Sequence, residues 1–149
     1  MSKFSNILVP VDFSEHSVNA VRLAVSLGRH FGSKLTLLHI GVVPHVYAAE
    51  LGLGGTAGPM FSEMSQAAAA EQYHRLERLA REEVPESMDV VTLVREGFPP
   101  EEILAAVEAS GHDLVIMGTH GRTGIGRVLL GSVTERVMRA VPVPIMVTR

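Results

Sequence analysis

Five short apolar segments recur along the chain, and the segment between each pair has the periodicity or the capping residues of a helix. The apolar segments are Ile7–Val11, Lys34–Ile40, Met88–Val94, Asp113–Met117 and Pro144–Thr148. No hairpin signal joins any two of them, and runs that are apolar along their whole length are typical of strands buried on both faces. The alternation therefore predicts an α/β domain with a parallel sheet and helices on both faces.

Start and stop residues mark the helices between these strands. Ser14 is expected to cap the first helix and Gly32 to end it, while Pro99, with a second proline and two glutamates after it, begins another that ends at Gly111. The other two helices are predicted over residues 61–84, with an apolar face through Tyr73, Leu76 and Ala80, and over most of residues 128–141.

Length and composition narrow the class of protein. A chain of 149 residues suits one domain, here residues 1–149, and a net charge of -3 does not indicate binding to nucleic acid or to an anionic membrane. The absence of cysteine excludes disulfides, thiolate metal sites and cysteine nucleophiles, and the seven histidines lack metal-site spacing. No apolar run is long enough to cross a membrane and no signal-peptide core opens the chain, so we expect a soluble, cytoplasmic protein.

One stretch after the fourth apolar segment is rich in glycine. "GTHGRTGIGRVLLGSVTERV", from Gly118 to Val137, contains five glycines and then turns helical. A strand, a glycine-rich loop and a helix start can together bind phosphate. The nucleoside-triphosphatase loop would need lysine where Ser132 stands, and the dinucleotide fingerprint would need glycine at Leu129. Ser132 also lacks the flanking glycines of a hydrolase nucleophile.

The spacing that remains, Gly118-x2-Gly121-x9-Gly131-Ser132, resembles the nucleotide-binding signature of the universal stress protein family. The segments ILVPVDFSEHS, LLHI, DLVIMGTHG and VPIMVTR resemble that family as well, so the resemblance extends over the whole chain. It implies an open five-stranded parallel sheet of order 3-2-1-4-5, Rossmann-like and similar to the adenine nucleotide alpha hydrolases, that binds ATP with Mg²⁺ assisting.

With the strand order that the resemblance implies, the residues also indicate where a ligand would bind. In open parallel sheets, ligands bind beyond the strand ends where the strand order reverses. Asp12 follows the first strand, and Gly118 and Gly121 follow the fourth. A carboxylate can accept hydrogen bonds from two ribose hydroxyls, and glycines let backbone amides approach phosphate. The alternatives are that Asp12 is only a turn or capping residue and that Gly124 and Gly126 simply shape a flexible loop.

The resemblance assigns individual roles. Around adenine and ribose it implies Pro10, Asp12 and Ile40. Along the ribose and the phosphates it implies Met117, Gly118, Gly121, Gly131, Ser132, Val133 and Thr134. Arg127, which flanks the loop, is a candidate for contact with the γ-phosphate, whereas Arg122 fits a surface residue. His39 is expected to be a packed core residue, and His120 to lie in the loop.

The leading functional interpretation is an ATP-binding stress-response module that regulates and does not catalyse efficiently. Beyond Asp12 the sequence shows no positioned base, no loop lysine and no acidic pair for metal-assisted hydrolysis. Two alternatives stay open, a nucleotide hydrolase on the same fold and a nucleotide-free interaction protein that acts as a dimer. AMP, cyclic nucleotides and dinucleotides also remain open as ligands.

Two further expectations concern the loop over residues 41–59 and the last strand. The loop has many glycines and no periodicity, and we expect it to be mobile and to close over the adenine. Prolines at 142 and 144 predict that Val143–Thr148 is an edge strand, because proline has no N–H to donate to a hydrogen bond between strands. An open apolar edge favours a homodimer that pairs this strand with its copy, and the resemblance implies the same arrangement.

Overall fold

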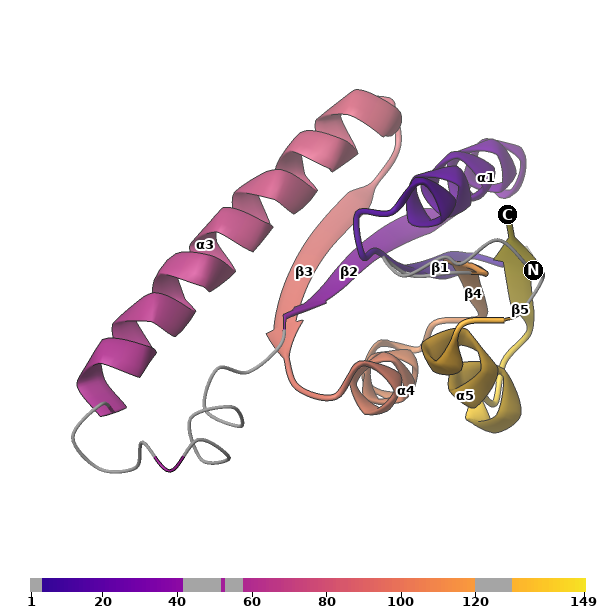
Figure 1. Ribbon diagram of the computed structural model, residues 1–149. Coiled ribbons are helices and arrows are strands. Elements are labelled where there is room, and N and C mark those ends of the chain that lie inside the picture. Colours follow the sequence, from indigo (N-terminus) through magenta and orange to yellow (C-terminus); the bar gives the residue numbers. More distant parts are fainter. Residues whose placement is uncertain (1–3, 42–51, 53–57, 120–129) are drawn as a thin grey trace.

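Five parallel strands form one sheet in the order β3-β2-β1-β4-β5 (Figure 1). The structure is a computed structural model that describes residues 4–41, 52, 58–119 and 130–149. The strands are β1 (Asn6–Pro10), β2 (Lys34–Gly41), β3 (Val90–Glu96), β4 (Leu114–Gly118) and β5 (Ile145–Thr148). The predicted fold class and strand order are confirmed, and the strand bounds differ from the predicted ones by one or two residues.

Helices cover both faces of the sheet, as the alternation predicted. They are α1 (Glu15–Phe31), α3 (Gly58–Glu83), α4 (Pro99–Ser110) and α5 (Ser132–Ala140). Figure 1 shows α1 and α3 on one face and α4 and α5 on the other. Because side chains alternate along a strand, Ile7 and Val9 of β1 belong to the core under α1 and α3, and Leu8 belongs to the core under α4 and α5.

The predicted caps set the ends of α1 and α4. The Ser14 side chain accepts a hydrogen bond from the Ser17 amide at the start of α1, and Gly32 ends that helix with a left-handed φ of 68°. Pro99 begins α4 and Gly111 ends it with φ 61°. Glycine suits both ends because a side chain would strain this backbone conformation.

Helix α5 occupies most of the segment over which the sequence predicted it. Leu130 and Gly131 are not helical, and the helix begins at Ser132 and ends at Ala140. The Gly131 amide donates to the carbonyl of Thr119 at 2.7 Å. This bond ties Gly131 back to the end of β4, and so delays the first turn of the helix.

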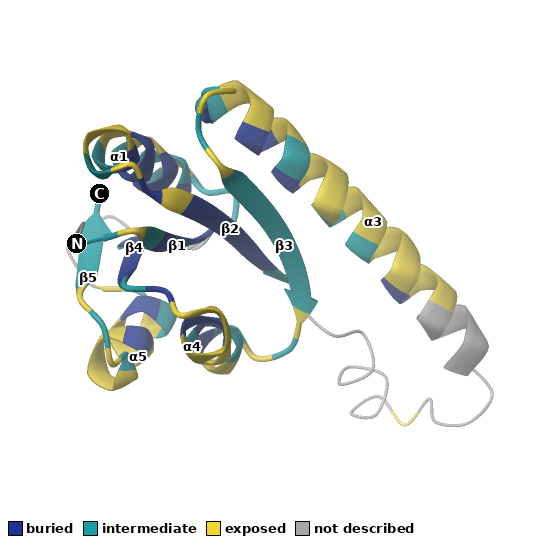
Figure 2. Cartoon of the chain, turned by 180° about the vertical axis from the view of Figure 1, so that it is seen from behind, coloured by how far each residue is buried: buried dark blue, intermediate teal, exposed yellow. Residues whose placement is uncertain are grey.

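Helix α3 buries a narrower stripe than its sequence predicted. Figure 2 shows a helix that is mostly exposed, with buried residues along one side. Leu76 and Ala80 are buried as expected, but Tyr73 is 44% exposed and does not belong to the predicted apolar face. Helix α3 lies along β3, the edge strand, where there is less sheet to cover, and a stripe through Leu76, Leu79 and Ala80 is sufficient.

Some predictions fall on parts of the chain that the structure does not describe. Most of the loop over residues 41–59, with the lid expected there, lies outside the described residues. Gly121 and Arg127, two predicted site residues, also lie outside them, as do His120 and Arg122. Among the helices that are described, none is long and apolar enough to span a membrane.

Candidate functional site

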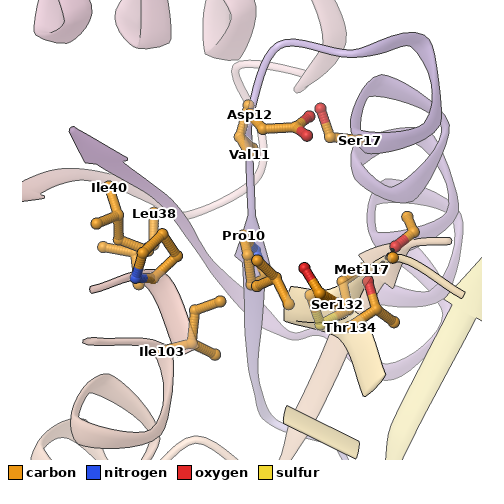
Figure 3. Close-up of a pocket in the computed structure, with 14 residues that line it drawn as sticks. Pro10, Val11, Asp12, Ser17, Leu38, Ile40, Ile103, Met117, Ser132 and Thr134 are labelled. Atoms are coloured by element: carbon orange, nitrogen blue, oxygen red, sulfur yellow. Dashed lines mark hydrogen bonds between the residues drawn. The ribbon is translucent and has the colours of Figure 1, made fainter. Parts of the chain in front are cut away.

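A cavity of about 240 Å³ opens beyond the carboxyl ends of the central strands. Strand β1 lies between β2 and β4, so the sheet is extended in opposite directions on its two sides, and this reversal is where open α/β sheets bind ligands. Figure 3 shows side chains from β1, β2, α4 and α5 around the cavity. Its lining residues are Pro10, Val11, Asp12, Ser17, Leu38, Ile40, Pro99, Ile103, Met117, Gly118, Gly131, Ser132, Val133 and Thr134.

The structure brings the described part of the predicted site together in this one cavity. The predicted residues that line it are Pro10, Asp12, Ile40, Met117, Gly118, Gly131, Ser132, Val133 and Thr134. They come from β1, β2, β4 and α5, from the loop after β1 and from the residue before α5, and are separated by up to 124 positions in the chain, from Pro10 to Thr134. These residues lie together because the crossover connections of a parallel sheet place the carboxyl ends of its strands at the same edge.

Asp12 is anchored to the first turn of α1. Its Oδ1 accepts hydrogen bonds from the backbone amide of Ser14 at 2.9 Å and from the Ser14 hydroxyl at 2.5 Å. The same hydroxyl accepts from the Ser17 amide at 3.2 Å, so one serine fixes both the carboxylate and the helix start. Asp12 is therefore a turn residue and a pocket residue at once. Both bonds that it accepts from described residues involve Oδ1, which leaves Oδ2 for a ligand.

The start of α5 presents backbone donors. Gly131 is its N-cap and supplies no side-chain hydrogen bond. The first helical bond joins the Glu135 amide to the Gly131 carbonyl at 2.9 Å, so the N–H groups of Ser132, Val133 and Thr134 have no acceptor within the helix. These groups and the positive end of the helix dipole form an anion-binding arrangement at the pocket. The Thr134 hydroxyl donates to the Gly118 carbonyl at 2.9 Å and ties this turn to β4.

Gly118 has a structural reason to be glycine. A β-carbon there would lie 2.8 Å from the backbone carbonyl carbon of His16, closer than such atoms approach in proteins. The end of β4 therefore packs directly on the first turn of α1. Glycine at 118 is required by this contact inside the protein, whereas the sequence suggested that it makes room for phosphate.

The opposite wall of the pocket is apolar. It is formed by Leu38 and Ile40 of β2 and by Pro99 and Ile103 of α4. Ile103 is 1% exposed and also belongs to the core under α4 and α5. A flat apolar ligand group would find its contacts on this side, because the polar donors are on the α5 side.

The backbone of Ile40 also faces this pocket. The Leu38 carbonyl points toward β1, where it accepts from the Val11 amide at 2.8 Å. Backbone groups two residues apart on a strand point to the same side, so Ile40 directs its N–H and C=O toward β1 as well. By that point β1 has ended, and the carbonyl of Val11 lies 2.7 Å from His39 Nδ1 instead. A donor and an acceptor of Ile40 are thus presented side by side to a ligand.

Comparison with known proteins identifies the family. Residues 3–149 match the model of the universal stress protein family. The chain belongs to that family. It is 29% identical over 147 residues to universal stress protein MJ0531 of Methanocaldococcus jannaschii. The match covers 98% of this chain and 82% of the relative.

Solved structures resemble this universal stress protein over its full length. The structure of MJ0577 from Methanocaldococcus jannaschii has a TM-score of 0.83 at 28% identity, and covers 98% of this chain and 96% of that one. The universal stress protein from Archaeoglobus fulgidus in complex with dAMP has a TM-score of 0.57 at 15% identity, over 100% of both chains. The second likeness concerns the fold alone.

Five lining residues of this universal stress protein were not predicted from its sequence. They are Val11, Ser17, Leu38, Pro99 and Ile103. Val11, Ser17 and Leu38 lie within five residues of a predicted site residue, and their proximity was a usable signal. Pro99 and Ile103 follow β3, a strand that is not adjacent to the pocket, and their sequence pattern indicates only a helix start and a core position.

Proposed function

We propose that this universal stress protein binds an adenine nucleotide in the pocket, with ATP assisted by Mg²⁺ as its ligand. The observation that carries the proposal is the polarity of the pocket: an apolar wall on one side, a helix start with free N–H groups on the other, and the carboxylate of Asp12 after the strand between them. A nucleotide has the same order of groups, with an apolar base, a sugar rich in hydroxyls and an anionic phosphate chain.

The apolar wall suits the base. Pro99 and Ile103 offer flat or branched carbon surface against the faces of a purine, and the backbone of Ile40 supplies one donor and one acceptor at its edge. Adenine carries an amino group that donates beside a ring nitrogen that accepts, which matches a neighbouring C=O and N–H. A guanine edge, whose carbonyl replaces the amino group, fits this pair less well.

The sugar and the phosphates would follow toward α5. Asp12 Oδ2 is available to accept from ribose hydroxyls, and the amides of Ser132, Val133 and Thr134 can donate to phosphate oxygens. We propose Gly121 and Arg127 as further phosphate contacts on the resemblance of their motif. The Archaeoglobus fulgidus relative, whose structure holds dAMP, supports an adenine nucleotide as a ligand of this fold.

We further propose that the protein binds nucleotide as a regulatory module and is at most a slow hydrolase. Asp12 is the only carboxylate among the described residues that line the pocket, and its Oδ1 is engaged by Ser14. A catalyst of phosphoryl transfer would also need a group that orients the attacking water. Steady-state hydrolysis by the purified protein tests this point, and turnover faster than about once per second would favour the hydrolase alternative.

The test of the ligand is to identify what the protein retains. Mass spectrometry of the supernatant after denaturation should detect an adenine nucleotide. Calorimetric titration of nucleotide-free protein should give a dissociation constant for ATP in the micromolar to millimolar range, which corresponds to a binding free energy of about −8 to −4 kcal/mol. Adenosine should bind more weakly because it lacks phosphate. No retained nucleotide and no heat with ATP or AMP would instead support a nucleotide-free interaction protein.

We also propose that two copies pair through the C-terminal strand, over Val143–Thr148. Strand β5 lies at the edge of the sheet and pairs in the described structure with β4 alone, so its outer ladder is available. Ile145→Lys or Val147→Pro should shift the protein from dimer toward monomer in analytical ultracentrifugation, while ATP binding largely survives. A wild type that sediments as a monomer at tens of micromolar would contradict this arrangement.

A further inference from the structure

The residue after Asp12 has an unusual backbone conformation. Phe13 has φ 65°, in the left-handed region, where a bulky side chain is strained. Such strain persists only where the surroundings hold the residue, and it is concentrated at functional sites. The conformation of Phe13 turns the chain so that the amide and hydroxyl of Ser14 reach back to Asp12.

Two groups hold the ring of Phe13 in place. The guanidinium of Arg75, on α3, lies over the ring with its Cζ 4.2 Å from the centroid. The imidazole of His39, on β2, packs against the ring at a centroid distance of 4.6 Å and an interplanar angle of 41°. His39 Nδ1 also lies 2.7 Å from the carbonyl of Val11. The residues on both sides of Asp12 are therefore anchored through the same histidine.

We infer that Phe13 is a positioning residue for Asp12, held by Arg75 and His39, and that it determines how strongly the pocket recognises the ribose hydroxyls. The inference rests on the proposed function and extends it to residues that do not line the pocket. With Oδ1 fixed by Ser14, the direction of Oδ2 depends on the backbone of Asp12 and Phe13. Loosening that backbone lets the carboxylate rotate and weakens its bonds to the sugar.

The experiment compares ATP with 2′,3′-dideoxy-ATP, which lacks both ribose hydroxyls. We expect the wild type to prefer ATP by about tenfold or more, which is the range for hydrogen bonds to a charged group. In Phe13→Ala this preference should fall to about twofold to threefold. Affinity for the dideoxy compound should change little, because its contacts do not involve Asp12. Asp12→Ala should abolish the preference, and adding Phe13→Ala to it should have no further effect on the ratio.

Phe4 provides a matched control within the same chain. It is the other non-glycine residue of the described structure with a positive φ, 68°, and like Phe13 it is partly buried against the core under α1 and α3. Its ring contacts Phe31, 5.7 Å away between centroids, and no pocket residue is involved. Phe4→Ala should lower thermal stability about as much as Phe13→Ala, yet leave the preference for ATP unchanged.

Arg75→Ala gives a second readout that does not endanger folding, since Arg75 is exposed. It removes one of the two groups that hold the ring and should lower the preference for ATP over the dideoxy compound about twofold or more. This variant therefore tests the inference even if Phe13→Ala does not fold. An unchanged preference in Arg75→Ala and Phe13→Ala would overturn the inference and leave nucleotide binding intact. A wild type that binds neither compound would overturn the proposed function, and the inference with it.

Discussion

Helices α4 and α5 both begin at the pocket, and their first turns present different chemistry to it. Helix α4 starts with Pro99 and Pro100, which have no N–H group, and continues with two glutamates. Helix α5 starts after Gly131 with Ser132, and its first turn keeps all its N–H groups. Both helices direct the positive end of their dipole to the same cavity, yet the first turn of α4 lacks two of the N–H groups that α5 offers to an anion.

The comparison shows that a helix start is not an anion site by its dipole alone. At α4 the prolines remove two hydrogen-bond donors and the two glutamates offset the positive potential, and Pro99 and Ile103 contribute an apolar wall. At α5 the glycine cap leaves the donors free. The orientation that we propose for the nucleotide, with its base toward α4 and its phosphates toward α5, follows from this difference of a few residues.

The largest expected effect comes from giving α5 the chemistry of α4. Val133→Pro removes an N–H from the first turn, where proline is compatible with a helix. Affinity for ATP should fall about tenfold to a hundredfold, because a charge-assisted hydrogen bond is lost, while affinity for adenosine should change less than about threefold. Calorimetric titration measures both constants.

Val133→Ala is the control for this change, since it shortens the side chain and keeps the N–H. It should bind ATP within about threefold of the wild type. Equal losses in the alanine and proline variants would show that the side chain of Val133 matters, and its amide does not.

A second pair of variants sharpens the division of the pocket. Asp12→Ala should weaken adenosine and ATP alike, by about tenfold, because the sugar is common to both. Ser132→Ala should weaken ATP by about threefold to tenfold and leave adenosine unchanged, because its hydroxyl lies at the phosphate end. The measurement is again titration with both ligands. The proposed orientation would be contradicted if Ser132→Ala weakened adenosine as much as ATP, or if Asp12→Ala weakened ATP alone.

The sequence predicted most of the helices and strands because their positions and ends are marked by local residue patterns. Ser14, Gly32, Pro99 and Gly111 each mark a helix end through their own backbone or capping chemistry. The apolar runs predicted parallel strands, but the strand order came from the resemblance, since alternation alone allows several topologies. Tyr73 was misplaced because the width of a helix's buried stripe depends on how much sheet lies beneath it, which no local pattern records.

The candidate site was only partly predictable for a related reason. Asp12, Gly131 and Ser132 belong to motifs with recognisable spacing. Ile103 has the pattern of any core residue, and only the crossover of α4 brings it to the pocket. The contacts of Arg75 and His39 with the ring of Phe13 were not predictable either, because these two residues come from two other elements and meet Phe13 only in the folded chain.

Salt should separate the two ends of the pocket without any substitution. The α5 end would bind phosphate through charge and the α4 end would bind the base through apolar contact, and only the former is screened by ions. Raising sodium chloride from about 0.05 to about 0.5 M should weaken ATP severalfold and leave adenosine within about twofold. Parallel weakening of both ligands would indicate that the phosphates contribute little.

The smallest expected effect concerns the far end of α4, where the contrast with α5 continues. His112 follows this helix and is 4% exposed, and its Nδ1 lies 3.0 Å from the Ala106 carbonyl, to which it can donate. Burial lowers the pKa of His112 below its usual value, and nearby Arg95 acts in the same direction, although Asp113 and the bond to Ala106 oppose the shift. Nε2 is buried too and has no hydrogen-bond partner in the described structure.

Stability should therefore depend on pH through this histidine. The unfolded chain takes up a proton at His112 as pH falls through about 6.5, while the folded protein resists it, so the free energy of unfolding decreases below that pH. Urea unfolding at pH 7.5, 6.0 and 5.0 should show a loss of stability toward low pH that is smaller in His112→Gln, which retains a donor but does not titrate. The same pH slope in both proteins would show that other groups cause it. Helix α5, by contrast, ends in the exposed ion pair of Arg139 and Glu135, 2.8 Å apart, and has no buried histidine in its last turn.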